Sequence, residues 1–296
     1  MKEPIIKLMI MSSITILSVS VFYFINLSFQ KMPTILNKEE TFPPYENSVT
    51  YIGHATVLIH LDDLNIITDP IYSTYMSILA KRHIESGIDF EKLPAIDAIL
   101  ISHEHWDHLD KSTLGKFPKN TPVIISKGLG DKIQKLGFTD VRELSWWDST
   151  QVKQATIIAV PVKHILSKPS GYIIKHNNQT VYFAGDTGLS DHFREIGNKY
   201  SIDIALLPIG DYYPRLWFIP GFTKMTRQRH MAPGDVPEAI NMLKSKIVIP
   251  IHWGTFKISG TGLNEPIEWL NEIIDKNKLE DKIKILKHGE KYLFGQ

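Results

Sequence analysis

Short apolar runs rich in valine and isoleucine recur from residue 49 to the end of the chain, separated by turn residues and by longer stretches with helical spacing. Such runs are typical of β-strands, and apolar positions that return every three or four residues indicate amphipathic helices. The pattern predicts strands at 50–60, 65–68, 98–102, 122–126, 156–162, 171–175, 180–184, 204–209, 247–251 and 282–286. It predicts helices at 111–117, 129–137, 190–200, 235–244 and 264–277.

The predicted elements are connected in two ways. A hairpin is predicted to turn at Asn177 and Asn178, whereas other strands alternate with helices. Neither a purely parallel sheet nor an all-β sandwich accommodates both connections, but two sheets flanked by helices do. We therefore predict one α/β domain over residues 49–296.

The N-terminus departs from this globular pattern. Residues 8–29 carry no charge and are flanked by lysines, and as a helix they would reach about 33 Å, enough to span a bilayer core. A cleavable signal peptide shares the basic start, but its apolar region is usually only about 7–15 residues long. We predict a transmembrane anchor over residues 1–30 and a proline-containing linker over 31–48. Lysines on both sides leave open which side of the membrane carries the domain.

Composition narrows the chemistry that the chain can perform. The 296 residues carry 33 Lys and Arg against 32 Asp and Glu, a formal net charge of +1, so no basic excess points to a nucleic-acid partner. Cysteine is absent, which excludes disulfides, thiolate metal ligands and a cysteine nucleophile. Any metal site must therefore use His, Asp or Glu. The oligomeric state is left open by the sequence.

The densest group of such residues follows the predicted strand at 98–102. The segment 103–108 reads HEHWDH and supplies His103, His105, Asp107 and His108. A turn directs neighbouring side chains to different sides, so His103 and His105 can serve one metal while Asp107 and His108 serve another. Imidazole and carboxylate ligands suit zinc, with manganese or iron as weaker candidates.

The remaining ligands are predicted at the ends of other strands. His164, Asp186 and His252 each follow a short apolar run, and Asp186 is presented between Gly185 and Thr187. A single histidine at a strand end is more often structural than metal-binding. Together with the dense group at 103–108, however, the three residues complete the donor set that a metal site needs.

These motifs resemble the metallo-β-lactamase superfamily, and the resemblance runs from about residue 51 to residue 293. Within it the chain is similar to the N-acylphosphatidylethanolamine-hydrolysing phospholipase D group. The segments that carry this closer similarity are 52–56, 68–70, 144–147, 207–210, 213–215, 251–256 and 286–290.

The resemblance implies a four-layer αββα sandwich with the site along one edge of its paired sheets. It implies two zinc ions, one on His103, His105 and His164 and the other on Asp107, His108 and His252, with Asp186 bridging them. Two such ions lower the pKa of a water molecule towards neutrality and stabilise charge on the attacked oxygen. We therefore expect a hydrolase that needs no serine or cysteine nucleophile.

The residues around the ligands receive weaker assignments. The resemblance places His230 on a loop near the site, so it is a candidate to assist the leaving group, although a surface position is equally compatible. His54 and His288 lie in family motifs and are expected to form structural hydrogen bonds. Asp69 is expected to support the ligands from behind.

The substrate is the least determined part of the prediction. We expect a phosphodiesterase of phospholipase D type acting at a membrane on N-acylphosphatidylethanolamine-like phospholipids, and the aromatic and basic residues between 212 and 229 suit a membrane interface or an acyl groove. The segment after His164 is shorter than in that group and resembles the sugar-lactone hydrolases, so a lactone or another small carboxylic ester is the alternative substrate. A membrane-tethered metal-binding protein without activity is a third interpretation.

Overall fold

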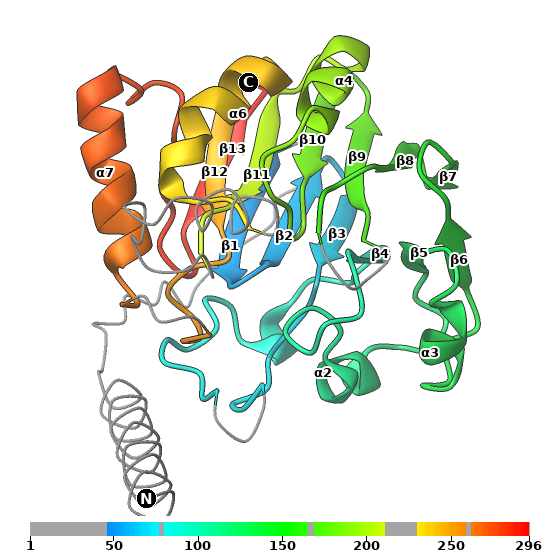
Figure 1. Cartoon of the computed structure of the whole chain (residues 1–296). Helices are drawn as coiled ribbons and strands as arrows, with labels where there is room; N and C mark the ends of the chain where they lie inside the picture. Colours follow the sequence, from blue (N-terminus) through cyan, green and yellow to red (C-terminus); the bar gives the residue numbers. More distant parts are fainter. Residues whose placement is uncertain (1–45, 77–79, 165–168, 211–229, 259–261, 296) are drawn as a thin grey trace, which may run out of the picture.

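The predicted strands pair into two sheets (Figure 1) in a computed structural model that describes residues 46–76, 80–164, 169–210, 230–258 and 262–295. From edge to edge the first sheet contains β13 (Lys291–Phe294), β1 (Asn47–Gly53), β2 (Thr56–Leu61), β3 (Leu64–Thr68), β4 (Ala98–Ile101), β5 (Val123–Ser126) and β6 (Val141–Leu144). The second contains β12 (Ile247–Ile251), β11 (Ile204–Pro208), β10 (Gln179–Phe183), β9 (Gly171–His176), β8 (Ala155–Val160) and β7 (Ser149–Val152).

Both sheets are mixed, as the two kinds of predicted connection require. Strands β3 to β6 run parallel in the first sheet and β10 to β12 in the second, whereas their other neighbours pair antiparallel. The β9–β10 hairpin turns at Asn177, which has a φ of 50°. The helices are α2 (Lys111–Lys116), α3 (Gly130–Gln134), α4 (His192–Lys199), α6 (Val236–Leu243) and α7 (Glu265–Asn277), with short 3₁₀ turns at Phe90–Lys92 and Pro233–Asp235.

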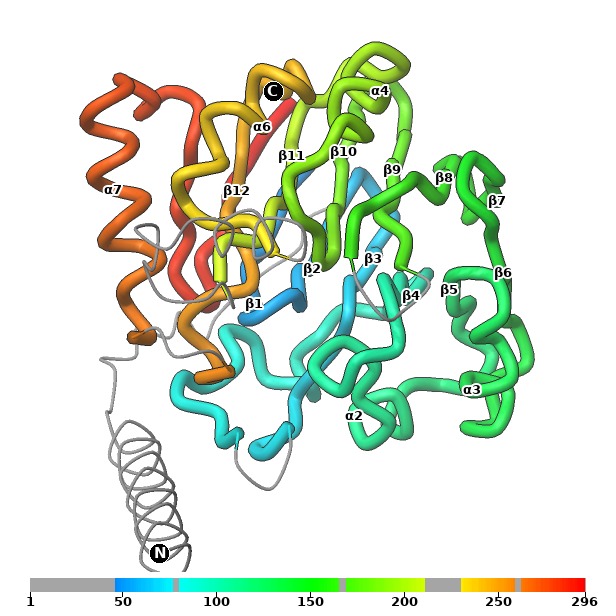
Figure 2. Tube along the Cα trace, viewed as in Figure 1, coloured from blue at the N-terminus to red at the C-terminus, as the bar shows by residue number. Residues whose placement is uncertain are grey.

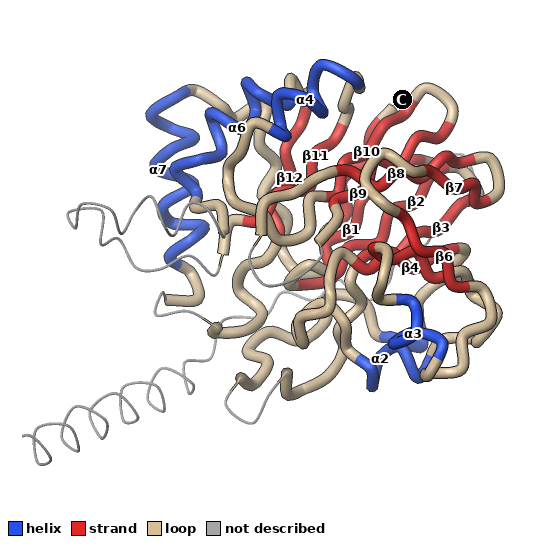
Figure 3. The backbone as a smooth tube through the Cα atoms, turned by 45° about the vertical axis from the view of Figure 1, so that its right-hand side comes forward, coloured by secondary structure: helices blue, strands red, loops and turns tan. Residues whose placement is uncertain are grey.

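Alternation along the strands separates the layers. In β4, Leu100 joins the core cluster that both sheets share, while Ile99 faces a second cluster that contains Leu114 of α2 and Ile133 of α3. Successive side chains of a strand point to opposite faces, so β4 is buried on both. Figure 3 shows the resulting arrangement, with α2 and α3 beside the first sheet and α4, α6 and α7 beside the second. The two-sheet α/β fold predicted from the sequence is confirmed.

Several predicted boundaries are wrong for identifiable reasons. The strand predicted at 50–60 is broken into β1 and β2, because Gly53 and His54 take φ values of 142° and 56° that turn the chain. The segment predicted as a strand at 282–286 makes only an isolated parallel bridge, between Ile283 and Val248. Three strands were not predicted, namely β6, β7 and β13, and all three lie at sheet edges. Edge strands carry more polar residues, which weakens the apolar alternation.

The predicted anchor over 1–30 and most of the predicted linker lie outside the described residues, as does the aromatic and basic stretch 212–229. Within the described ranges, no helix combines the length and the apolar character needed to cross a bilayer.

Candidate metal centre

The predicted ligands come together at one edge of the two sheets. His103 follows β4, Asp186 follows β10 and His252 directly follows β12. Because parallel strands present their carboxyl ends at the same edge of a sheet, residues far apart in the sequence converge there. Asp69 follows β3 and His164 follows β8 at this same edge.

One set of ligands is formed by His103, His105 and His164. Their ligand nitrogens all lie within 4.8 Å of one another. The His164 Nε2 and His105 Nδ1 atoms are 3.3 Å apart, and the His103 ring centroid lies 4.4 Å from that of His105. His103 is fully buried while the other two rings are partly exposed. The set is therefore anchored in the core and open towards solvent on one side.

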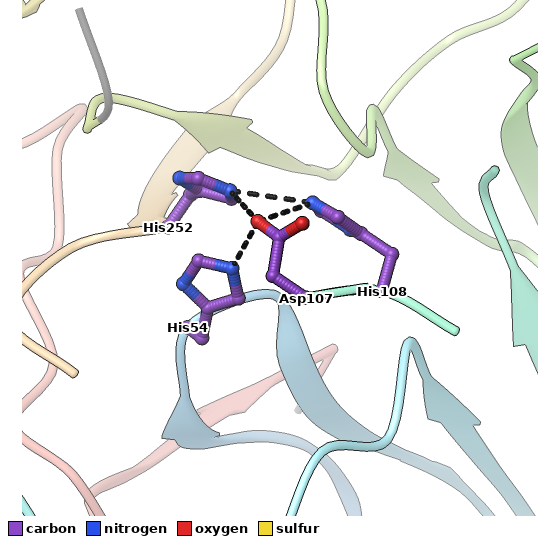
Figure 4. Close-up of side chains that lie close together, drawn as sticks. All are labelled: His54, Asp107, His108 and His252. Carbon is purple, nitrogen blue, oxygen red and sulfur yellow. Dashed lines mark hydrogen bonds and ion pairs between the residues drawn. The ribbon is translucent and has the colours of Figure 1, made fainter. Parts of the chain in front are cut away.

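A second set is formed by Asp107, His108 and His252, joined by His54 (Figure 4). The Asp107 Oδ2 atom lies 3.3 Å from the Nε2 atoms of both His108 and His252, and 2.9 Å from His54 Nε2. The two Nε2 atoms of His108 and His252 are themselves 3.3 Å apart. Three side chains thus direct ligand atoms at one small volume, with His54 alongside.

Asp186 lies between the two sets. Its Oδ2 atom is 3.2 Å from His108 Nε2, and its Oδ1 atom is 3.2 Å from His252 Nε2. It also groups with His103 and with His164 at ligand spacing. Gly185 makes this approach possible, because a Cβ atom there would lie 2.5 Å from the Cβ atom of Ser102 and its φ is 58°.

The donor set fits divalent cations. The Nε2 atom of His103 is buried and has no hydrogen-bond partner among the described residues, which is costly unless another group satisfies it. The His105–His164 and His108–His252 nitrogen pairs face each other at 3.3 Å. A cation between such nitrogens would satisfy both lone pairs, and imidazole with carboxylate is the ligand chemistry of zinc. That these residues bind metal stays a prediction, as do the identity and number of the ions.

The charges of the site are strongly coupled. Burial opposes ionisation of Asp186, but His108 and His252 hold its pKa well below the usual range. Burial would likewise lower the pKa of His108, yet the carboxylates of Asp186, Asp107 and Asp69 raise it well above the ordinary value. Burial lowers the pKa of His103 well below that of a free histidine. Without metal, these charges thus favour the ionised form of Asp186 and the protonated form of His108.

Asp69 supports the ligands from behind, as expected from the sequence. Its buried carboxylate accepts hydrogen bonds from the Ser102 backbone N–H at 2.7 Å and from the Ser102 hydroxyl at 2.6 Å. Its Oδ2 atom also lies 2.7 Å from His108 Nδ1. This contact directs Nε2 of His108 towards the centre, the arrangement by which carboxylates orient metal-binding histidines.

His54 was expected only to form structural hydrogen bonds, and its contact with Asp107 was not predicted. It is buried, its φ is 56°, and its ring centroid lies 3.9 Å from that of His252. Its carbonyl oxygen accepts a 2.7 Å hydrogen bond from the His252 backbone N–H. The glycine before it was the one available sequence signal of a sharp turn. His288, by contrast, hydrogen-bonds to Thr255 and joins neither ligand set.

His230 lies at the site and not on the open surface. Its Nδ1 atom is 3.7 Å from Asp186 Oδ2, and its ring centroid lies 4.9 Å from that of His164. Burial lowers its pKa to about 4. The structure therefore brings together all the residues predicted for the site: His103, His105, Asp107, His108, His164, Asp186, His230 and His252.

Comparison with known proteins agrees with this geometry. The Beta-lactamase superfamily domain matches residues 64–253. An uncharacterised Mycobacterium tuberculosis protein is 31% identical over 250 residues, which cover 75% of this chain but only 63% of that protein. A Caenorhabditis elegans N-acyl-phosphatidylethanolamine-hydrolyzing phospholipase D is 31% identical over 254 residues, covering 76% of this chain and 69% of the relative.

A solved structure shows the same fold. The crystal structure of a possible metal-dependent hydrolase from Veillonella parvula superposes with a TM-score of 0.71 at 18% identity, covering 84% of this chain and all of the other. The family match over most of the domain and the converging His and Asp residues lead to one conclusion. The chain belongs to the metallo-β-lactamase superfamily.

Proposed function

We propose that the chain is a dinuclear zinc phosphodiesterase of the phospholipase D type, acting on N-acylphosphatidylethanolamine-like lipids. The observation that carries this proposal is the position of Asp186, whose two carboxylate oxygens reach the second ligand set while it also groups with the first. The 31% identity to the C. elegans phospholipase D supports the choice of substrate. Other divalent ions of similar ligand preference can replace zinc in such a site.

The residues of the chain hold and complete the centre. His103, His105 and His164 would hold one ion and Asp107, His108 and His252 the other, with Asp186 between them. When bound, such a pair activates water and stabilises negative charge on a phosphoryl oxygen.

His230 is neutral near pH 7 because burial lowers its pKa, so it keeps one ring N–H donor. It lies beside Asp186 and His164. We assign to this N–H a hydrogen bond to the leaving alkoxide oxygen, which stabilises the negative charge that develops there as its bond to phosphorus breaks.

Residues 8–29 complete the proposal, since a lipid substrate resides in a membrane. This uncharged segment flanked by lysines is long enough to serve as a single-pass anchor. We propose that it holds the catalytic domain at the bilayer. Western blotting of membrane and soluble fractions, before and after alkaline carbonate extraction, tests this directly. Release of the full-length chain by carbonate would refute the anchor.

The decisive experiment is a hydrolysis assay with a phospholipid panel and mass detection of products. Cleavage of the proposed bond yields an N-acylethanolamine and phosphatidic acid. EDTA should abolish the reaction and zinc should restore it. His103→Ala and Asp186→Ala should be inactive. His60 is a buried histidine near the end of β2 that points away from the metal centre, so His60→Ala should keep activity. A zinc-loaded protein that cleaves no phosphodiester would refute the proposal.

The alternative is a lactone or carboxylic ester hydrolase. It is favoured by the short connection between His164 and β9, which begins at Gly171. Lactone and phosphodiester turnover measured on one preparation separates the two reactions. If His103→Ala and Asp186→Ala changed neither turnover nor any cellular phenotype, a membrane-tethered protein without catalytic activity would be favoured instead.

A further inference from the structure

A cavity of about 660 Å³ opens beside the metal centre, where the chain crosses from the first sheet to the second. The connection from β6 to β7 forms one side of it and can be followed in Figure 2. His164, a member of the first ligand set, lines the cavity. Its volume is that of a small-molecule site, and its position places any occupant next to the reacting group.

Two tryptophans in this connection line the cavity. The Trp146 side chain is 45% exposed, although its Nε1–H donates a 2.9 Å hydrogen bond to the Pro169 carbonyl. Trp147 takes a φ of 76°, and the Lys199 ammonium lies 3.5 Å from its ring centroid. A bulky residue at such a φ is strained, and strain persists where surrounding contacts fix it, often at ligand sites. The two indoles are therefore held in place before any ligand arrives.

Exposure of Trp146 is unusual for this chain. Over the ranges that the structure describes, only four large hydrophobic side chains are exposed to a similar degree or more, namely Tyr75, Trp106, Trp146 and Leu293. Trp146 is the member of this group that lines a cavity next to a predicted metal ligand. Exposed apolar surface in a concave site is the usual basis for binding an apolar ligand.

The same cavity also offers polar groups. Ser126 and Ser170 both line it, both are buried, and the Ser126 hydroxyl donates a 2.8 Å hydrogen bond to the Ser170 hydroxyl. Each hydroxyl has one donor and two acceptor positions, so the pair keeps capacity for a further hydrogen bond to an amide. Apolar aromatic walls with a few fixed polar groups match a ligand that carries a hydrocarbon chain on an amide.

From these observations we infer that the cavity binds the N-acyl amide of the substrate, the part that leaves with the cleaved alcohol. This inference rests on the proposed function, in which the scissile phosphate lies at the metal centre. In an N-acylethanolamine leaving group, two carbons separate the scissile oxygen from the amide nitrogen. The amide would then lie beside His164 and the serines, with the acyl chain against Trp146. Trp146 is thus a residue that determines specificity for acyl chain length.

Binding of N-acylethanolamines tests the inference without hydrolysis. The full chain in phosphatidylcholine nanodiscs, stripped of metal by EDTA, is titrated with ligands of four to ten acyl carbons. Affinity should rise by up to about fourfold per added methylene. Trp146→Ala should weaken binding of the longest ligand by about tenfold and reduce the dependence of affinity on acyl-chain length. Trp146→Phe should restore most of the lost affinity. Tyr75→Ala, which removes an exposed aromatic outside the cavity, should behave as wild type.

Failure of the inference and failure of the proposed function give different results. Suppose that binding depends on acyl-chain length, that Trp146→Ala abolishes this dependence, and that no lipid is cleaved. This result would support the cavity assignment and refute the phospholipase activity. If wild type and Trp146→Ala both cleave the lipid at rates that do not depend on acyl-chain length, the phospholipase activity would be supported and the cavity assignment would be overturned. Equal binding by wild type and by a Trp146→Ala variant with an unchanged melting temperature would also overturn it.

Discussion

Replacing Asp69 by asparagine isolates the contribution of a buried carboxylate that touches no metal. The Asp69 side chain is fully buried and receives three donors, the Ser102 N–H, the Ser102 hydroxyl and His108 Nδ1. Asparagine has nearly the same shape but only one acceptor oxygen, and its NH₂ group is itself a donor. In either amide orientation, at least one donor of the protein faces another donor.

The size of the effect follows from this mismatch. A buried donor left without an acceptor costs about 1–3 kcal/mol of folding free energy. Loss of the carboxylate behind a metal-binding histidine typically lowers metal affinity by about 10–100-fold, which corresponds to roughly 1.4–2.8 kcal/mol. In the wild type the contact between Asp69 and His108 Nδ1 fixes the tautomer that presents Nε2 to the site. We therefore expect Asp69→Asn to bind zinc about 10–100-fold more weakly.

The measurement is a zinc titration against a competing chelator, with thermal unfolding of the metal-free protein in parallel. Asp62→Asn is a matched control, because Asp62 also pairs with a histidine, His176, at 3.0 Å. Asp62 lies in the turn before β3 and His176 is the last residue of β9, so the pair lies at the ends of the strands away from the metal centre. Asp62→Asn should leave zinc affinity unchanged. Wild-type affinity in Asp69→Asn would refute the role assigned to this carboxylate.

Three further predictions concern the same edge of the sheets. His54→Ala should lower zinc affinity at the Asp107 site severalfold, and His54→Gln should recover part of it by restoring a donor to the 2.9 Å contact; equal affinities for all three proteins in a chelator titration would contradict this. Zinc binding at pH 7 should release protons, because carboxylates that outweigh burial raise the pKa of His108 and ligation requires its neutral form. Zinc affinity should therefore rise with pH. Proton release is measured by calorimetry in buffers of different ionisation enthalpy, and its absence would contradict the prediction. Gly185→Ala should lower zinc affinity and the melting temperature, since its new Cβ atom would meet Ser102 at 2.5 Å, and an unchanged melting temperature would count against that crowding.

The strands that carry the ligands could be predicted because they are buried on both faces. Such strands read as continuous apolar runs, and the run at 247–251 matches β12 at both ends. The polar residue that ends each run was therefore visible in the sequence. Edge strands such as β6, with the sequence VREL, lack this signal because one side faces solvent.

The role of His54 could not be read from the sequence for a different reason. Its contact with Asp107 joins residues 53 positions apart, and no local pattern reports such a pairing. The positive φ that directs its ring to the site belongs to a non-glycine residue, where propensity argues against the turn. The sequence identifies the donors that face a metal because their chemistry is distinctive. It does not identify the residues that orient those donors, because their chemistry is shared with ordinary buried histidines.

The arrangement separates the parts of the molecule that set the reaction from those that set the substrate. The predicted ligands follow β4, β8, β10 and β12, and these strands are held by the core that both sheets share. The cavity with Trp146 lies instead at the connection between two edge strands, β6 and β7. Edge connections tolerate change better than core strands because fewer contacts depend on them. Altering Trp146 should therefore change which acyl chain is accepted while zinc affinity stays constant. Altering Asp69 should lower zinc affinity and leave the acyl-chain preference unchanged.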